Sequence, residues 1–293
     1  DKIETPLPDA FATTLEPGRP ASLRFAKTGS TRPSLPAAPA LVDEANRAVL
    51  FHFFANHELL AAELMALAIL RFHEAPRAFL RGLCHTLAEE QRHTRWYLER
   101  MTSCGVDFGA YPENRFFWDS VSSMSSPLEY DSRLSLDFEQ ANLDYSRHYA
   151  GVLSKAGDAK SAAILDQIYR DEISHVGYGL RWFRKWKSQS ESDWNGLEKQ
   201  LSFPLSPIRA KGNQIPFNRE GRRAAGFDEA YIEKLRLYER SRGRTPNVYF
   251  FNPEAENRAA CAPAPYEPSA RVRSVIQDLE TLILFLAKRD DLV

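Results

Sequence analysis

The sequence is poor in cysteine and has no excess of charge of either sign. Its three cysteines, Cys84, Cys104 and Cys261, form no C-x-x-C pair, so neither a disulfide framework nor a cysteine-ligated metal site is expected. This cysteine usage favours a reducing, cytoplasmic compartment. The 38 lysines and arginines nearly cancel the 39 aspartates and glutamates, giving a net charge of −1. The overall charge therefore gives no support for binding to nucleic acid or to an anionic membrane.

Long apolar runs are missing as well. No stretch approaches the roughly 20 apolar residues that a membrane-spanning helix needs, and the best run, 282–287, has charged residues on both sides. Residues 1–6 lack the apolar core of a signal peptide. We therefore expect a soluble protein without a membrane partner. Its 293 residues, 43% of them apolar, are enough to bury a full core.

The sequence does contain the pattern of four long helices, at residues 43–73, 76–104, 126–155 and 158–187. Three of them begin at a residue that can cap the first turn, and the other begins at a proline. The connections within each pair are short, whereas the one between the pairs is longer. This arrangement favours an all-α four-helix bundle made of two antiparallel hairpins over residues 42–190, and we expect no β-strand.

Two flanking segments lack this pattern. Residues 1–41 are rich in proline, which fixes φ and removes a backbone donor, so we expect an extended arm or a disordered leader there. Residues 191–293 are expected to form a C-terminal extension of loops and short helices that packs on the bundle. Within that extension, helices are predicted over 228–240 and 271–288.

Two E-x-x-H motifs stand on the predicted helices. One pairs Glu90 with His93, and the other pairs Glu172 with His175. Residues three apart share one face of a helix, so each motif can direct a carboxylate and an imidazole at one point. A single E-x-x-H motif most often forms a solvated surface pair, so one such motif alone does not indicate a metal site.

The spacing of two further glutamates changes this interpretation. The sequence separation is 32 between Glu58 and Glu90, and it is 33 between Glu139 and Glu172. In each hairpin a glutamate therefore lies opposite an E-x-x-H motif at one level of the bundle, in the first hairpin roughly 24 Å from the loop. Four carboxylates and two histidines form the ligand set of ferritin-like di-iron or di-manganese proteins. The predicted ligands are Glu58, Glu90, His93, Glu139, Glu172 and His175.

The surroundings of the predicted ligands support a metal more than a structural ion pair. The helix faces around Glu58 and Glu172 are apolar and hold no lysine or arginine, and a lone carboxylate there must lose its charge or find a cation. Glu63 is the alternative ligand on the first helix. It is turned away from Glu58, and its spacing of 27 to Glu90 does not match the second hairpin, so we prefer Glu58.

Two acids immediately precede the glutamates of the motifs. A metal-bound imidazole usually donates its other N–H to a carboxylate, which fixes the orientation of the ring. We expect Asp171 to hold His93 and Glu89 to hold His175, each across the helices. The alternative is that both are ordinary surface acids.

The helix faces beside the site carry small and polar residues. Ser135, Asn142 and Ser146 lie near Glu139, while glycines at 177 and 179 follow the second motif. The glycines either leave room for a substrate or dioxygen beside the metals or allow tight helix packing.

Several segments of the bundle and its tail carry a family resemblance. They are residues 56–64 (NHELLAAEL), 88–93 (AEEQRH), 157–165 (GDAKSAAIL), 170–176 (RDEISHV), 181–183 (RWF), 216–219 (PFNR) and 224–227 (AAGF). They resemble the ferritin-like family catalogued as domain of unknown function 455, over roughly residues 42–228. The resemblance implies a di-metal site with the six ligands named above. The chain is similar, more distantly, to the non-haem di-iron hydroxylase that modifies tRNA.

The function expected from these observations is oxidation chemistry at two metal ions. Carboxylate-rich ligation suits iron, although manganese or a mixed pair fits the same ligands. We expect an oxidoreductase that activates dioxygen to hydroxylate or desaturate a small-molecule substrate, with the extensions serving as a pocket cover or as the contact of a homodimer. A ferroxidase or metal-handling role without an organic substrate is one alternative.

The other alternative is a tRNA-modifying enzyme, for which local basicity would supply the nucleic-acid contact. The residues concerned are Arg181, Arg184, Lys185, Lys187, Arg209, Lys211, Arg219, Arg222 and Arg223.

Overall fold

The computed structural model describes residues 16–20, 23, 25, 33–238 and 249–287, and this part of the chain contains helices and no strand. It divides into two compact units, Asp1–Leu237 and Tyr238–Val293. The predicted all-α class is confirmed. The boundary between the units lies well beyond residue 190, where the sequence suggested that the bundle ends.

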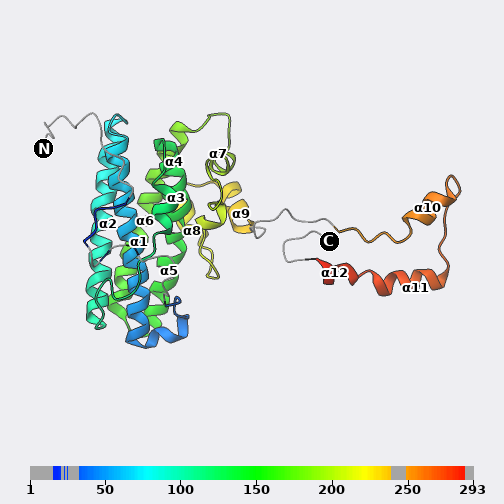
Figure 1. Cartoon of the computed structure of the whole chain (residues 1–293), viewed down its shortest axis with the longest axis horizontal. Helices are drawn as coiled ribbons and strands as arrows, with labels where there is room; N and C mark the ends of the chain where they lie inside the picture. Colours follow the sequence, from blue (N-terminus) through cyan, green and yellow to red (C-terminus); the bar gives the residue numbers. More distant parts are fainter. Residues whose placement is uncertain (1–15, 21–22, 24, 26–32, 239–248, 288–293) are drawn as a thin grey trace. The chain divides into compact units, whose positions relative to one another are not determined.

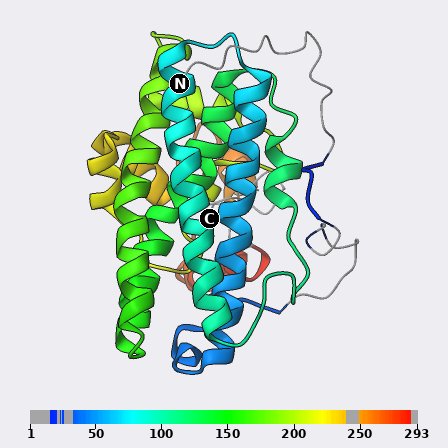
Figure 2. The ribbon, with the colours of Figure 1, turned by 90° about the vertical axis from the view of Figure 1, so that its left-hand side faces the viewer.

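Four long helices run side by side in the first unit (Figures 1 and 2). They are α1 (Glu44–Arg71), α2 (Arg77–Ser103), α5 (Glu139–Lys155) and α6 (Ala159–Trp186). The most extensive contacts join α1 to α2 and α5 to α6, so the unit is built from the two predicted hairpins. Asp43 and Asp158 cap α1 and α6, because their side chains accept hydrogen bonds from backbone N–H groups of the first turn.

The third predicted helix differs from expectation because its middle is a π-helix. It begins as α4 (Pro127–Tyr130), widens into η3 (Asp131–Phe138), and continues as α5. The wide turn packs closely on α6, since a Cβ atom at Gly179 would lie only 2.3 Å from the Cβ atom of Ser135. A Cβ atom at Gly177 would lie 3.0 Å from the carbonyl oxygen of Ala225. The glycines therefore allow tight packing, and the idea that they leave room for a substrate is wrong.

Two apolar clusters fill the bundle on either side of one polar level. One includes Leu64 and Met65 of α1 with Leu83 of α2. The other includes Phe54 of α1 and Tyr97 of α2. Residues 58 and 90 lie between these positions along their helices, so the predicted ligands occupy a layer enclosed by apolar side chains. Such a layer excludes water and raises the cost of any unpaired charge.

Shorter elements, which the sequence did not predict, close the bundle. They are η2 (Ala38–Val42), α3 (Phe116–Val121), α7 (Asp193–Gln200), η4 (Pro207–Ala210) and α8 (Arg219–Ala225). The predicted helix over 228–240 is present as α9 (Glu229–Leu237), and residues 239 and 240 lie outside the described residues.

The C-terminal part of the first unit (residues 191–237, the tail) is joined to the bundle by a buried ion pair. The guanidinium of Arg222 in α8 donates to both carboxylate oxygens of Asp144 in α5, at 2.6 and 2.9 Å. Asp144 also accepts the backbone N–H groups of Gly212 and Asn218. Both charged side chains are almost completely buried, so each depends on the other for compensation.

The ends of the chain meet the predictions only in part. Most of the expected N-terminal arm, including residues 1–15 and 26–32, lies outside the described residues. In the second unit, the predicted helix over 271–288 is divided into α11 (Ala270–Leu279) and α12 (Leu282–Leu286), preceded by α10 (Ala255–Cys261). Residue 288 lies outside the described residues. The expected packing of this unit on the bundle stays a prediction.

One helix of the described residues is long and apolar enough to cross a membrane by length and composition alone. This helix is α1, and 61% of its most apolar window is buried inside the unit. Leu60, Leu64 and Met65 of this helix are buried, whereas Phe53 and Leu70 are exposed.

Candidate metal centre

The bundle brings all six predicted ligands to one level. Glu58 comes from α1, Glu139 from the first turn of α5, and the two E-x-x-H motifs from α2 and α6. None of the six side chains is more than 4% exposed. The π-helix ends immediately before Glu139, so its changed phase contributes to directing this carboxylate into the core.

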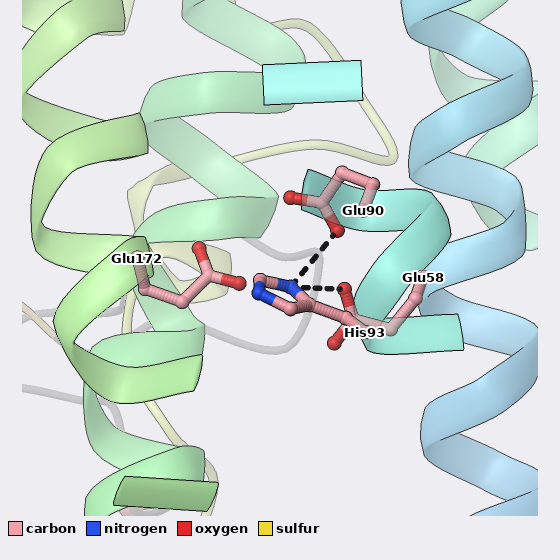
Figure 3. Close-up of side chains that lie close together, drawn as sticks. All are labelled: Glu58, Glu90, His93 and Glu172. Atoms are coloured by element: carbon pink, nitrogen blue, oxygen red, sulfur yellow. Dashed lines mark ion pairs between the residues drawn. The ribbon is translucent and has the colours of Figure 1, made fainter. Parts of the chain in front are cut away.

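Four of these side chains form a tight cluster (Figure 3). In Glu58, Glu90, His93 and Glu172, one possible ligand atom of each lies within 4.8 Å of those of the other three. His93 Nδ1 is 3.7 Å from Glu58 Oε2 and 3.6 Å from Glu90 Oε2. The cluster could hold a metal ion and spans three of the long helices.

The two remaining predicted ligands adjoin this cluster. His175 Nδ1 lies 2.9 Å from Glu90 Oε1 and 3.8 Å from Glu172 Oε2. Glu139 is joined to Glu172 through the side-chain amide of Asn142. Glu63, the alternative from the first helix, points elsewhere and binds the guanidinium of Arg19 through both oxygens.

The two predicted cross-helix contacts of the imidazoles are present. His93 Nε2 lies 3.1 Å from Asp171 Oδ2, and His175 Nε2 lies 2.8 Å from Glu89 Oε2. With Nε2–H donating to a carboxylate, each ring presents Nδ1 to the interior. Arg92 Nη2 donates to both acids, at 3.0 Å each, and so ties the two contacts together.

Burial and mutual repulsion shift the pKa values of the glutamates. Burial, followed by the charge of Glu90, raises the pKa of Glu58 to about 8. Burial also raises the pKa of Glu139 and of Glu172 well above the ordinary value, and neighbouring carboxylates add to both rises. For Glu90, burial acts in the same direction, but contacts with Glu58 and both histidines outweigh it and hold its pKa low. Four carboxylates this close cannot all ionise without cations nearby.

The histidines respond in the opposite direction. Burial lowers the pKa of His175, but Glu89 and Glu90 outweigh it and raise the pKa to about 10. The pKa of His93 is also raised, because Asp171, Glu58 and Glu90 outweigh burial. The layer thus compensates its negative charge with protons, which are the species that bound metal ions displace.

The layer holds buried polar atoms that are suited to bind cations. Each predicted ligand keeps at least one buried oxygen or nitrogen that has no hydrogen bond within the described part of the chain. These atoms are Glu58 Oε2, both oxygens of Glu90, His93 Nδ1, Glu139 Oε1, Glu172 Oε2 and His175 Nδ1. His175 Nδ1 and Glu90 Oε1 lie 2.9 Å apart and interact as an ion pair. A buried polar atom without a hydrogen bond still costs about 1–3 kcal/mol, so such atoms on six residues at one level require an explanation. Metal cations bound here would pair with these atoms and offset the charge of the carboxylates.

Arg92 was missed from the sequence, and Asn142 was noted only as a polar residue near Glu139, without a predicted contact. Arg92 lies three residues after Glu89, and Asn142 lies three residues after Glu139, so each shares a helix face with the acid that it contacts. This spacing was available as a signal. What it did not reveal is that each side chain also reaches an acid on α6.

The basic residues considered for RNA binding are largely engaged with acids. Arg184 and Lys187 pair with Asp193. Arg219, Arg222 and Arg223 pair with Glu233, Asp144 and Glu229 respectively. These acids compensate part of the local positive charge, and nucleic-acid binding stays an untested alternative.

Comparisons with known proteins give a family but no activity. The family described as "Protein of unknown function (DUF455)" matches residues 2–233. A protein of Haemophilus influenzae, itself described as uncharacterized, is 22% identical over 157 residues, which is 53% of this chain and 54% of that protein. The chain therefore spans about half the length of this relative. No solved structure matches the chain significantly.

Proposed function

The chain belongs to the DUF455 family of proteins of unknown function, and we propose that it is a ferritin-like, non-haem di-iron oxidoreductase. It would activate dioxygen to hydroxylate or desaturate a small organic substrate. The observation that carries the proposal is the convergence of unpaired buried atoms from six residues at one level of the bundle. Carboxylates and imidazoles together are the donor set that suits iron, with manganese as the other candidate.

Each residue of the layer has a definable task in this proposal. The carboxylates of Glu58, Glu90, Glu139 and Glu172 and the Nδ1 atoms of both histidines would hold the metal pair. Iron, when bound, supplies one-electron chemistry and a site at which dioxygen can react. With metal bound, Asp171 and Glu89 would each accept the Nε2–H of an imidazole and so leave Nδ1 as the atom for the ion. The apolar clusters on both sides keep bulk water away from the reacting centre.

An oxidative role on an organic substrate explains more of the chain than metal storage does. A storage protein needs only the four helices, whereas this chain fastens a tail to α5 through the buried Arg222–Asp144 pair and carries a further unit beyond residue 237. A ferroxidase that handles metal without an organic substrate is the alternative to be separated by experiment.

The first experiment is elemental analysis of the protein purified from its native host, with an optical spectrum after exposure to dioxygen. We expect about two iron or manganese ions per chain, as the six-ligand set requires. Glu58→Gln should lower this content, whereas Glu63→Gln, on the same helix but bound to Arg19, serves as the matched control. A colourless protein that takes up neither metal would contradict the proposal.

A second measurement separates catalysis from metal handling. Dioxygen consumption by the iron-loaded protein should depend on an added organic substrate if the enzyme oxidises that substrate. Consumption proportional to added Fe²⁺, with iron accumulating far beyond two ions per chain, would support the ferroxidase alternative instead.

A further inference from the structure

The side chain of Asn142 lies between two of the proposed ligands. It stands one turn after Glu139 in α5 and is 7% exposed. Its Nδ2 atom donates to Glu139 Oε2 and to Glu172 Oε1, both at 3.1 Å. One amide nitrogen therefore uses its two N–H groups on two carboxylates that belong to different helices.

The oxygens that Asn142 leaves free are the ones that the proposed site needs. Glu139 Oε1 and Glu172 Oε2 are buried and have no hydrogen bond within the described residues. Each carboxylate is thus held by one oxygen and presents the other to the interior. A neutral donor can do this without occupying the place of a cation, whereas a lysine or arginine at this position would compete with the metal.

The other half of the layer has no corresponding amide. In the described residues, no side-chain amide or hydroxyl group donates to the carboxylate of Glu58 or of Glu90. These two carboxylates are near His93 Nδ1 instead. The two halves repeat the same ligand types, but only the α5–α6 half fixes its carboxylates with a neutral donor.

We infer that Asn142 is a positioning residue that holds Glu139 and Glu172 as ligands of one of two ions, so that the two ion positions depend on different supports. The inference rests on the proposed metal site and identifies how one half of it is organised. Ligands that are already oriented lose less conformational freedom when an ion binds. Glu172 also belongs to the cluster of Glu58, Glu90 and His93, whereas Glu139 does not, so Asn142 reaches both sides of the layer through Glu172 and only one side through Glu139. Removing the amide therefore weakens the ion between α5 and α6 most, while the ion near Glu58, Glu90 and His93 loses less affinity.

The test is a Co²⁺ titration of the full-length protein in the presence of a competing chelator, followed by the visible absorption of the bound ion. Asn142→Leu removes the donor at similar volume. Because hydrogen-bond partners of metal ligands typically contribute roughly 10- to 100-fold to metal affinity, we expect one of two Co²⁺ equivalents to weaken by about that factor and the other to weaken clearly less. Equal weakening of both equivalents would overturn the inference.

Gln140→Leu is the matched control. Gln140 is a fully buried amide on the same helix, but it lies beside the hydroxyl group of Tyr231 and away from the carboxylates. It should leave both Co²⁺ affinities unchanged, even if it lowers stability. A loss of one equivalent in both variants would attribute the effect to helix packing and overturn the inference.

The remaining outcomes are equally decisive. If Asn142→Leu does not fold, as judged by circular dichroism and a thermal melt, Asn142→Ala removes the same donor without adding bulk and replaces it in the titration. Wild-type affinities at both positions in a folded variant would overturn the role of Asn142 and leave the proposed function intact. A wild-type protein that binds no Co²⁺ would overturn both.

Discussion

The two helix hairpins of the bundle carry the same ligand types on different supports. In the α1–α2 hairpin both helices are regular, and Glu58, Glu90 and His93 lie within reach of one another. In the α5–α6 hairpin a π-helix precedes Glu139. The side-chain amide of Asn142 donates to the carboxylates of both Glu139 and Glu172. The second hairpin is also fastened from outside, through Asp144 and Arg222.

This difference shows that a repeated ligand motif does not imply a repeated environment. In the first half, Glu58 and Glu90 lie near His93 Nδ1, and Asp171 of α6 contacts the other nitrogen of that ring. The second half depends on a neutral donor within the layer and on a tail that comes much later in the chain, since the sequence separation between Asp144 and Arg222 is 78. Changes in the two halves should therefore have different consequences.

The largest expected effect is the loss of an ion. Replacing Glu139 or His175 with Ala should abolish binding of at least one of two ions, because each removes a ligand atom that no neighbour can replace. The loss of metal affinity should exceed the roughly 10- to 100-fold weakening that is typical when a hydrogen-bond partner of a ligand is removed. Metal content by elemental analysis measures the result, and an unchanged stoichiometry in both variants would refute this ligand assignment.

The next effect concerns the buried ion pair between Arg222 of α8 and Asp144 of α5. Arg222→Ala leaves the buried carboxylate of Asp144 without its cation, which should lower the free energy of unfolding by about 3–5 kcal/mol. Urea denaturation measures this change. The adjacent Arg223→Ala removes an exposed pair with Glu229 and should have little effect. Equal stability of the two variants would mean that the buried pair does not hold the tail.

The two acids that contact the imidazoles, Asp171 and Glu89, should distinguish the two ions. Asp171→Asn weakens the orientation of His93, and Glu89→Gln weakens that of His175, so each should lower the affinity of a different ion by roughly 10- to 100-fold. Competition titrations with Co²⁺ would resolve the two positions. If both variants weaken the same ion, the histidines do not belong to separate halves of the site.

The smallest effect concerns the π-helix. Gly179→Ala places a methyl group against Ser135, and overpacking of this kind costs about 1–3 kcal/mol of unfolding free energy. Gly151→Ala in α5 is the control, since nothing lies within 4 Å of its Cβ position, and it should stabilise by about 0.5–1 kcal/mol. Thermal unfolding of both variants checks the sign of each change. A stabilising Gly179→Ala would show that η3 does not pack tightly on α6.

Much of the bundle could be predicted because its signals are local. Caps such as Asp43 and Asp158 begin the helices where the sequence suggested, and the helical period of the apolar residues sets the buried faces. The six ligands could be proposed because the rise of a helix converts the nearly equal spacings of the two glutamate pairs into a common level. The contacts of Asp171 and Glu89 followed from the chemistry of an oriented imidazole.

The remainder could not be predicted because it depends on partners far apart in the chain. The π-helix of residues 131–138 has i→i+5 hydrogen bonds and a wider turn than an α-helix, and the side-chain pattern of eight residues does not reveal this difference. The glycines at 177 and 179 had two interpretations until Ser135 and Ala225 were placed against them. Arg222 was counted among basic surface residues, yet it is fully buried.

The sequence by itself determined the helical class, the two hairpins and the types of group that meet inside them, because helical period and ligand spacing are properties of single helices. Only the tertiary structure decided which oxygen of Glu139 and of Glu172 is held by Asn142 and which is free, and that Arg222 of α8 pairs with Asp144 of α5. Those outcomes depend on contacts between helices, where angles and distances of a few ångströms determine which hydrogen bonds form.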